Sequence, residues 1–360
     1  MKDRHITVKF MSRNIAKEGD IECWLRQFPG KNPVWGNCRF VFDWNAREYD
    51  WLVVYHDLHR EKYKQSEEKL KCPKEKTILV TTEPSTITVY GTDYLNQFGH
   101  VLTSQEPWAI PHPNAIFSQP GLMWFYGLPF SNDPLNTYCS EDRFKTYDIM
   151  QKTTPPQKTK LLSTVCSQRE GKITLHSKRV SYTKLLKTDI EDLDIYGHGV
   201  KPMTDKAEAL DSYKYHIAIE NHVYPHHLTE KLPDAFLGYT LPFYYGCPNA
   251  GDYFHTDSFV PINIDNYKQS LDIIKSTISN NEYQDRLPYI IEARKRVLEK
   301  YNLFAVLDYE ITRINSQVNQ FTHNRKIMNR QTMRIKKPLA GIRSLFQKVM
   351  IKSKHRFKLT

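Results

Sequence analysis

Polar and charged residues that could bind a ligand are concentrated in residues 215–238, YHIAIENHVYPHHLTEKLPDAFLG. An apolar run there stops at Glu220 and Asn221, three histidines follow, and a Thr-Glu-Lys sequence opens a stretch with the composition of a helix. The short apolar run predicts a buried strand. Parallel α/β sheets bind ligands beyond the carboxyl ends of their strands. The segment could therefore hold a metal ion or an anion, or be an ordinary strand, loop and helix.

The Thr-Glu-Lys sequence suits an anion such as a pyrophosphate. Thr229 is a good helix N-cap, and Pro233 would then lie in the first turn, where proline is tolerated. Free N–H groups at a helix N-terminus attract negative charge, and Lys231 adds a positive charge at the same place. A capped helix start that binds nothing is the ordinary alternative, and this segment taken alone favours it.

A metal site is not expected in this segment. His222, His226 and His227 lie in the loop before the predicted helix. None of them has the i, i+4 helical spacing of a typical zinc-binding pair.

The order of apolar and polar stretches predicts two α/β domains. In the first part, strand-like runs alternate with polar, helix-compatible stretches such as residues 58–71, and this alternation favours a parallel sheet. The strands expected there are HITVKFM (5–11), YDWLVVYH (49–56), KTILVTT (76–82) and GHVLTS (99–104).

A polar, proline-rich stretch at residues 151–160 indicates a linker, and the strand pattern restarts after it. The second group of expected strands is 160–166, 193–197, 215–220, 241–246 and 259–263, with helices at 176–188, from Glu230, and over most of 269–317. We therefore predict an N-terminal α/β domain of residues 1–152, a C-terminal α/β domain of residues 153–324 with trailing helices, and a tail of residues 325–360.

Residues 325–360 carry the net positive charge. They contain 12 of the 51 Lys and Arg residues and none of the 40 Asp and Glu residues, so 39 basic and 40 acidic residues remain elsewhere. Pro338 could open a helix there, and apolar residues follow it at helical spacing: Leu339, Ile342, Leu345, Phe346, Val349 and Met350. A basic amphipathic helix lies in the membrane interface and is drawn to anionic lipids. A disordered or nucleic-acid-binding tail is the alternative.

The composition is that of a globular protein, with 40% hydrophobic and 12% aromatic residues. The six cysteines are scattered without a CxxC pair, and the first residues, MKDRHITVKFM, do not resemble a signal peptide. These features predict free thiols in a reducing compartment. No uncharged apolar stretch approaches the roughly 18 residues of a transmembrane helix.

The order of strand, Glu-Asn, loop, Thr-Glu-Lys and helix resembles the α-1,3/4-fucosyltransferase family, glycosyltransferase family 10. The family signature is F-x-x-x-F-E-N, six or seven residues, then Y-[IV]-T-E-K, a helix, a V/I-P-[VI] strand and a closing D-x-F-[IV]. The matching residues are Tyr215, Glu220, Asn221, Leu228, Thr229, Glu230, Lys231, Leu241-Pro242-Phe243, Gly246 and Asp257-Ser258-Phe259-Val260. Upstream, SKRVSYTKLLKT (177–188) and LDIYGHGVKP (193–202) are similar to the family's S-A-R-V-x-Y helix and V-D-V-Y-G strand and loop.

The resemblance implies which residues bind the donor. Arg179 corresponds to the arginine that holds the donor diphosphate, and a guanidinium is suited to this role because it binds phosphate oxygens bidentately. Lys231 is expected to share that role, Gly197 to line the site, and Asn221 to bind donor hydroxyls. Glu230 is expected to act in catalysis beside the ribose or the fucose ring.

Two positions depart from a simple match. His227 stands where the family has tyrosine, and as a donor-binding residue it could carry charge at about pH 6.5. Asp192 and Asp194 form a DxD sequence, the metal–nucleotide motif of other glycosyltransferases, but they occupy the family's V-D-V-Y-G slot. A metal role for them is therefore not expected.

The family also carries a glutamate after a strand of its first domain, in the context Glu-Ser-Pro. Glu83, which follows the strand predicted at 76–82 and precedes proline, is the candidate general base. Glu106 is the competitor, because it too follows a predicted strand and precedes proline.

The resemblance implies a GT-B fold, in which two Rossmann-like domains face each other across a cleft and the C-terminal one binds the donor. The implied reaction moves L-fucose from GDP-fucose to a hydroxyl of an oligosaccharide, with inversion and an α-1,3 linkage. No cofactor is expected, although a divalent cation could stimulate the reaction. Two alternatives stay open: a family member that uses another nucleotide-deoxysugar, and a non-catalytic protein that binds nucleic acid through its basic tail.

The expected partners are a GDP-sugar donor, an oligosaccharide or lipid-linked glycan acceptor, and an anionic membrane surface bound through residues 325–360 rather than a nucleic acid. GlcNAc or Glc of a lipopolysaccharide or another surface glycan is the acceptor we expect. The absence of a signal anchor differs from the secretory-pathway members of the family. It predicts a bacterial cytoplasmic enzyme on the inner face of the membrane.

Overall fold

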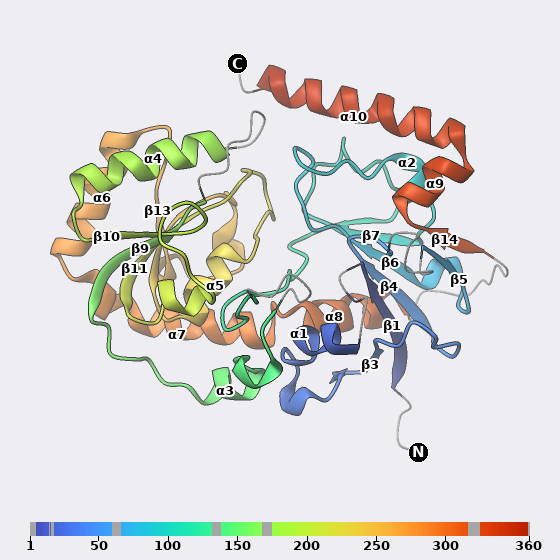
Figure 1. The fold of residues 1–360 in the computed structure, drawn as a ribbon, viewed down its shortest axis with the longest axis horizontal. Coiled ribbons are helices and arrows are strands. Elements are labelled where there is room, and N and C mark those ends of the chain that lie inside the picture. The colour runs from blue at the N-terminus through green and yellow to red at the C-terminus, as the bar shows by residue number, and fades with distance from the viewer. Residues whose placement is uncertain are drawn as a thin grey trace. The chain divides into compact units, whose positions relative to one another are not determined.

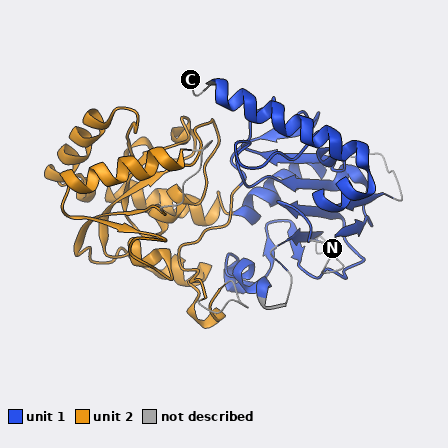
Figure 2. Cartoon of the chain, turned by 45° about the horizontal axis from the view of Figure 1, so that its top comes forward, with its two compact units in different colours: residues 1–120, 303–360 blue, residues 121–302 orange. Residues whose placement is uncertain are grey.

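The computed structural model describes residues 5–13, 15, 18–59, 66–131, 138–167, 175–315 and 325–358. The chain forms two compact units (Figure 2): unit 1 contains Met1–Pro120 and Leu303–Thr360, and unit 2 contains Gly121–Asn302. Each unit is built around its own largely parallel β-sheet (Figure 1).

Unit 1 contains a seven-stranded sheet in the order β2-β3-β1-β4-β6-β7-β8. Neighbouring strands are parallel except β2 and β3, which are antiparallel. Strands β4 and β6 are buried throughout, as expected when both faces of a parallel sheet are covered. The strands are β1 (Ile6–Ser12), β2 (Val34–Trp35), β3 (Cys38–Val41), β4 (Trp51–Tyr55), β6 (Thr77–Val80), β7 (His100–Thr103) and β8 (Ala115–Phe117).

The C-terminal part of the chain completes unit 1. Strand β14 (Lys326–Met328) pairs antiparallel with β5 (Glu67–Lys69). Phe304, in the first turn of α8, lies with its ring centroid 4.0 Å from that of Phe28 and 4.9 Å from that of Phe40. The α-helices of unit 1 are α1 (Glu22–Leu25), α2 (Thr92–Leu95), α8 (Leu303–Asn315), α9 (Arg330–Lys336) and α10 (Pro338–Lys358).

Unit 2 contains a five-stranded, entirely parallel sheet in the order β10-β9-β11-β12-β13. Helix α4 lies along one face of this sheet and α7 along the other (Figure 1). The strands are β9 (Lys160–Val165), β10 (Leu193–Tyr196), β11 (Tyr213–Ile219), β12 (Leu241–Tyr245) and β13 (Val260–Pro261). The α-helices are α3 (Tyr147–Lys152), α4 (His176–Asp189), α5 (Lys231–Leu237), α6 (Tyr267–Ser279) and α7 (Glu282–Glu299).

Both sheets reverse their strand order once. In unit 2 the chain passes from β9 outward to β10 and then back across to β11, and in unit 1 it passes from β1 outward to β3 and then back to β4. Such a reversal leaves a crevice at the carboxyl ends of the two central strands, where α/β sheets bind their ligands. The predicted fold class, two Rossmann-like α/β units, is confirmed.

The bounds of the two units differ from those of the predicted domains, which were 1–152, 153–324 and 325–360. Residues 121–152 belong to unit 2, because the N–H groups of Phe125 and Tyr126 bind Asp234 and the carbonyl of Met150 accepts a hydrogen bond from Arg294. Residues 303–315 belong to unit 1, since α8 packs there. These contacts join residues far apart in the sequence, so composition does not reveal them.

The segment 325–360 is a part of unit 1 and not a separate tail. Ile327 is completely buried in the core of unit 1, and Met333 is 2% exposed there. The predicted helix forms as α10 and begins at Pro338. Residues 67–69, which we expected in a helix over 58–71, form β5 because β14 supplies a partner strand; residues 60–65 lie outside the described residues.

Helix α10 has two different faces. Its inner face, with Ala340, Ser344, Ile351 and His355, is buried against unit 1. The predicted apolar stripe lies on the outer face, and its members are between 56% and 74% exposed: Leu339, Ile342, Leu345, Phe346, Val349 and Met350. No helix among the described residues is both long and apolar enough to span a membrane.

The burial of Ile327 predicts that the C-terminal segment stabilises unit 1. Ile327→Ala should lower the free energy of unfolding by about 2–5 kcal/mol, because it removes a side chain from a filled core. Leu345→Ala, on the exposed stripe, should change it by less than about 0.5 kcal/mol. Urea unfolding of both variants measures the difference. Equal effects of the two substitutions would contradict the assignment of Ile327 to the core.

Candidate functional site

A pocket of about 310 Å³ lies at the strand-order reversal of unit 2. Val165 at the end of β9, Gly197 after β10 and Ile219 at the end of β11 line it. It also contains five of the predicted site residues: Arg179, Gly197, Asn221, Glu230 and Lys231. The structure therefore brings together, around one cavity, residues that are as much as 52 positions apart in the sequence.

Gly197 allows the chain to turn at the edge of this pocket. Its φ of +137° lies in a region that side chains rarely adopt, and a Cβ atom there would lie 2.9 Å from the carbonyl of Cys166. The N–H of Gly197 donates to the carbonyl of Lys201 at 2.9 Å. A larger residue would push the β10 loop away from β9 and alter the pocket wall.

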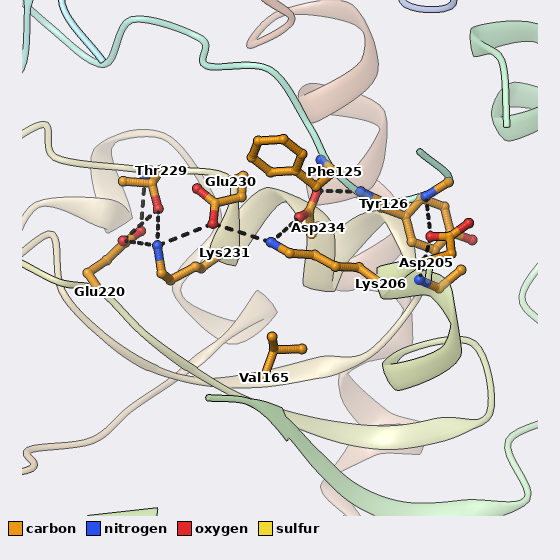
Figure 3. A network of polar contacts seen from close by, with 12 residues as sticks. Phe125, Tyr126, Val165, Asp205, Lys206, Glu220, Thr229, Glu230, Lys231 and Asp234 are labelled. Carbon is orange, nitrogen blue, oxygen red and sulfur yellow. Dashed lines mark hydrogen bonds and ion pairs between the residues drawn. The ribbon is translucent and has the colours of Figure 1, made fainter. Parts of the chain in front are cut away.

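Glu220 holds the Thr-Glu-Lys segment in place (Figure 3). Its fully buried carboxylate accepts hydrogen bonds from the N–H of Thr229 at 2.9 Å and from its hydroxyl at 2.6 Å, and it lies 3.2 Å from Lys231 Nζ. Thr229 was expected to cap the helix; this prediction is wrong, because Glu220 takes its hydroxyl and α5 begins at Lys231 with Glu230 as the N-cap. Pro233 lies in the first turn, as predicted.

Lys206 is a member of the pocket that the sequence analysis missed. Its Nζ lies 2.8 Å from Asp234 Oδ2 and 3.3 Å from Glu230 Oε1, and Glu230 Oε1 lies 3.3 Å from Lys231 Nζ (Figure 3). Lys206 is the first residue of the short helix Lys206–Ala209, and Asp205 and Glu208 form a capping box at the N-terminus of that helix. That D-K-A-E pattern was the available signal, because a capping box marks a helix start.

In this network, neighbouring opposite charges act on the pKa values of Glu230, Asp234 and Lys206 in the direction opposite to burial. Burial favours the neutral form of Glu230, but Lys206 and Lys231 hold its pKa below the ordinary value. Burial raises the pKa of Asp234 and the charge of Glu230 adds to that rise, although Lys206 opposes it. Burial disfavours the charge of Lys206, yet Asp234 and Glu230 raise its pKa above the ordinary value. Lys206 and Glu230 are therefore charged at neutral pH.

Arg179 is the cation of the pocket that has only neutral partners among the described residues. It is 7% exposed, Nη1 donates to the side-chain oxygen of Asn221, and Nη2 donates to the carbonyl of Val165 at 3.4 Å. Its buried Nε has no hydrogen-bond partner in the described structure. A buried charge without a counter-charge is costly, so this position suits an anionic ligand.

The histidines of the loop have separate environments. His227 is 1% exposed, its ring centroid lies 5.4 Å from that of His222, and it is not among the residues that line the pocket. His226 Nδ1 pairs with the hydroxyl of Tyr253. No group of three or more His, Cys, Asp or Glu side chains in the described ranges is arranged to hold a metal ion. A role of His227 in donor binding stays a prediction.

The two candidate bases lie in unit 1 and differ in accessibility. Glu83 follows β6 and is half-buried, whereas Glu106 is 3% exposed. The hydroxyl of Ser85 donates to Glu106 Oε2 at 2.5 Å and also lies 2.6 Å from His355 Nε2. Glu106 is thus enclosed in a buried polar cluster, while Glu83 is the more accessible carboxylate. The choice of Glu83 as the base stays a prediction.

Helix α10 forms hydrogen bonds and apolar contacts with the loop that contains Glu83. Besides the contact of His355 with Ser85, Lys352 Nζ donates to the carbonyl of Thr86 at 3.1 Å. Ile351 packs with Val89 and Ala109 in a small apolar cluster. The inner face of the C-terminal helix therefore fixes the conformation of the chain directly after Glu83.

Comparison with known proteins relates this chain to one family. Residues 155–284 match the family model for glycosyltransferase family 10 (fucosyltransferase) C-term. An alpha-(1,3)-fucosyltransferase of Helicobacter pylori is 34% identical over 93 residues, and a 3-galactosyl-N-acetylglucosaminide 4-alpha-L-fucosyltransferase of Bos taurus is 31% identical over 140 residues. A crystal structure of an alpha1,3-fucosyltransferase with GDP-fucose aligns over 89% of this chain and 93% of that chain, with 17% identity and a TM-score of 0.48.

The family match lies within unit 2. Residues 155–284 fall inside Gly121–Asn302 and contain all five predicted residues that line the pocket. The matched regions cover 25% and 37% of this chain, and they span 19% and 36% of the Helicobacter pylori and Bos taurus relatives.

The network around Lys206 predicts a pH-dependent loss of stability. A folded-state pKa of Glu230 below the unfolded value of about 4.3 contributes stability above that pH, and this contribution is lost as the pH falls. Lys206→Met raises the pKa of Glu230 and Asp234 and should cost about 3–5 kcal/mol at neutral pH. The deficit should shrink towards about pH 4, where the carboxyls of the variant become protonated.

Urea unfolding of wild type and Lys206→Met at both pH values measures this deficit. Lys178→Met is the matched control: its ion pair with Asp265 is exposed, so it should cost at most about 1 kcal/mol. A deficit of Lys206→Met that stays constant with pH would contradict the coupling of Lys206 to these carboxylates.

Proposed function

Since the chain belongs to glycosyltransferase family 10, as the resemblance of its motifs predicted, we propose that it is a fucosyltransferase that moves L-fucose from GDP-fucose to a hydroxyl of an oligosaccharide. The transfer is proposed to be a single displacement that inverts the anomeric carbon and forms an α-1,3 linkage. The proposed acceptor is a GlcNAc or Glc residue of a lipopolysaccharide or another surface glycan.

The observation that carries this proposal is Arg179, a nearly buried guanidinium with neutral partners, in a pocket that also contains Lys206 and Lys231. Arginine binds the oxygens of a diphosphate bidentately, and its charge does not depend on pH in the physiological range. We assign the diphosphate of the donor to Arg179 and Lys231, with Asn221 and Gly197 beside the donor.

Binding of a diphosphate requires Lys231 to change partners. In the structure, its Nζ lies 2.9 Å from Thr229 Oγ1, 3.2 Å from Glu220 Oε2 and 3.3 Å from Glu230 Oε1. A phosphate oxygen would compete with Glu230 for this ammonium group. Glu230, released from Lys231 but still next to Lys206, would then be available to the ribose or to the positive charge that develops on the fucose ring.

Negative charge grows on the β-phosphate as the bond between GDP and fucose breaks. Arg179 and Lys231, whose side chains are largely buried, stabilise this charge, and electrostatic interactions are stronger away from bulk water. Deprotonation of the acceptor hydroxyl needs a general base, and we assign it to Glu83, the accessible carboxylate of the pair in unit 1. The proton of the hydroxyl passes to Glu83, and the sugar oxygen displaces GDP.

Three substitutions test the proposed roles. Arg179→Ala and Lys231→Ala should each lower kcat/KM for GDP-fucose by about 10²–10³-fold, because each removes stabilisation of the leaving group. Glu83→Gln should lower kcat by about 10²–10⁴-fold through the loss of the base. Product formation from GDP-fucose on a soluble acceptor such as N-acetyllactosamine measures the rates.

Lys178→Ala is the matched control for Arg179, since it removes a neighbouring positive charge whose side chain is 59% exposed. Unchanged melting temperatures establish that the variants fold. Full turnover by both Arg179→Ala and Lys231→Ala would refute the assignment of the diphosphate site, and full turnover by Glu83→Gln would refute the base.

We further propose that the outer face of α10 binds the cytoplasmic surface of a bacterial membrane. Support comes from its six apolar side chains, which are 56–74% exposed, and from the basic residues of the same helix. Apolar side chains that enter the lipid interface, together with Lys and Arg beside anionic headgroups, provide the attraction. A lipid-linked glycan at that surface is the acceptor that this placement suits.

Substitution of the stripe tests membrane binding. Ile342→Asp together with Leu345→Asp should weaken co-sedimentation with phosphatidylglycerol vesicles at least about tenfold, because two apolar side chains no longer enter the interface. Ile291→Asp, at an apolar residue of α7 that is 42% exposed, is the control and should leave binding unchanged. Equal binding by the double variant and the control would contradict the proposal.

A further inference from the structure

A second pocket, of about 330 Å³, lies at the strand-order reversal of unit 1. Arg13 follows β1, Asp57 follows β4, and residues 87–89 belong to the loop after β6. The pocket therefore occupies the same place in the sheet of unit 1 as the first pocket does in unit 2, at the carboxyl ends of the central strands, where such sheets bind ligands.

The C-terminal segment supplies the opposite wall of this pocket. Arg330 and Arg334 come from α9 and Lys348 comes from α10. Together with Arg13, four cationic side chains line the cavity, and Asp57 is the one carboxylate among its lining residues in the part of the chain that the structure describes.

The carboxylate of Asp57 is already paired with a cation of the fold, Arg330. Asp57 Oδ2 accepts from Arg330 Nε at 2.9 Å, and Asp57 Oδ1 accepts from the hydroxyl of Tyr94 at 2.9 Å. Arg334 donates to the hydroxyl of Ser344 at 3.3 Å. Within the described ranges, Arg13, Arg334 and Lys348 form no ion pair with a carboxylate, so the part of the pocket lining that the structure describes has a surplus of positive charge.

The environment of His56 reflects this positive charge. His56 lies next to the pocket, with its Nε2 3.2 Å from Arg330 Nη2, and its Nδ1 lies 2.8 Å from the hydroxyl of Thr82. Burial, together with Arg330 and Arg13, lowers the pKa of His56 to about 3. His56 is thus neutral at physiological pH, and the arginines keep their charge throughout that range.

We propose that this pocket binds a phosphoryl group, and that the group belongs to the acceptor substrate. Arginines from two separate elements, Arg13 and Arg334, can each offer paired N–H donors to phosphate oxygens. Lys348 adds a third positive charge from the same helix that carries the exposed apolar stripe. A sugar phosphate of a lipid-linked glycan fits this combination, because its phosphoryl group lies close to the lipid.

The identity of the ligand as an acceptor rests on the proposed function, whereas binding of a phosphoryl group does not. A phosphoryl group could also come from the headgroup of an anionic membrane lipid. The two sources share the same chemistry at the pocket, and they differ in whether a soluble sugar phosphate binds.

Calorimetric titration of the full chain with N-acetylglucosamine 1-phosphate tests the site. Wild type should bind this probe at least about tenfold more tightly than N-acetylglucosamine, and Arg13→Ala with Arg334→Ala should remove about tenfold or more of that affinity, because hydrogen bonds to charged groups are lost. Arg356→Ala, at an exposed arginine of α10 that does not line the pocket, should leave the affinity unchanged. A urea-unfolding midpoint of the double variant equal to that of the wild type shows that unit 1 still folds.

Vesicles distinguish the source of the phosphoryl group. If the double variant loses binding to phosphatidylglycerol vesicles and wild type does not bind the sugar phosphate, the pocket is a lipid headgroup site and the acceptor assignment is overturned. If neither sugar phosphate nor vesicle binding depends on Arg13 and Arg334, the phosphoryl site itself is refuted. Failure of wild type to bind GDP would refute the proposed function and leave the phosphoryl site standing.

Discussion

The geometry of the pocket in unit 2 depends on a carboxylate that is completely buried at the end of β11. Glu220 receives both hydrogen bonds that Thr229 can donate, and it lies within ion-pair distance of Lys231. A buried carboxylate must be paired and hydrogen-bonded to be tolerated. The partners of Glu220 are Thr229 and Lys231, both in the Thr-Glu-Lys segment. Glu220 therefore positions Lys231 and the start of α5, beside the side chains that line the cavity.

The two units share one arrangement with different charge balances. Each has a pocket at the reversal of its strand order. In unit 2, Lys206 and Lys231 pair with Glu220, Glu230 and Asp234, whereas Arg179 has no carboxylate partner among the described residues. In unit 1, the described residues that line the pocket include more cations than carboxylates, because α9 and α10 supply basic side chains. The basic C-terminal segment thus lines this pocket and also contacts the loop after Glu83. Its outer face presents the exposed apolar stripe of α10.

Much of this arrangement was predictable because it is local. Strand periodicity located the β-strands that form the centre of both sheets, and the rule that ligands bind at carboxyl strand ends selected Asn221 and the Thr-Glu-Lys segment. The motif match added Arg179 and Gly197, and these two line the same pocket as Asn221, Glu230 and Lys231. The prediction of Thr229 as a helix cap was wrong because a more distant partner, Glu220, takes its hydroxyl. Lys206, the pairing of β14 with β5, and the return of α8 to unit 1 depend on tertiary contacts across long stretches of sequence, which periodicity does not record.

The central claim is that the pocket of unit 2 binds the diphosphate of a guanine nucleotide, and a thermal-shift comparison of GDP, UDP, CMP and dTDP tests it most directly. A ligand that binds only the folded protein raises its apparent stability by RT ln(1 + [L]/Kd). GDP is predicted to raise the melting temperature of the wild-type protein more than the other nucleotides do, and to lose this effect in Arg179→Ala. A shift with UDP and none with GDP would contradict the account.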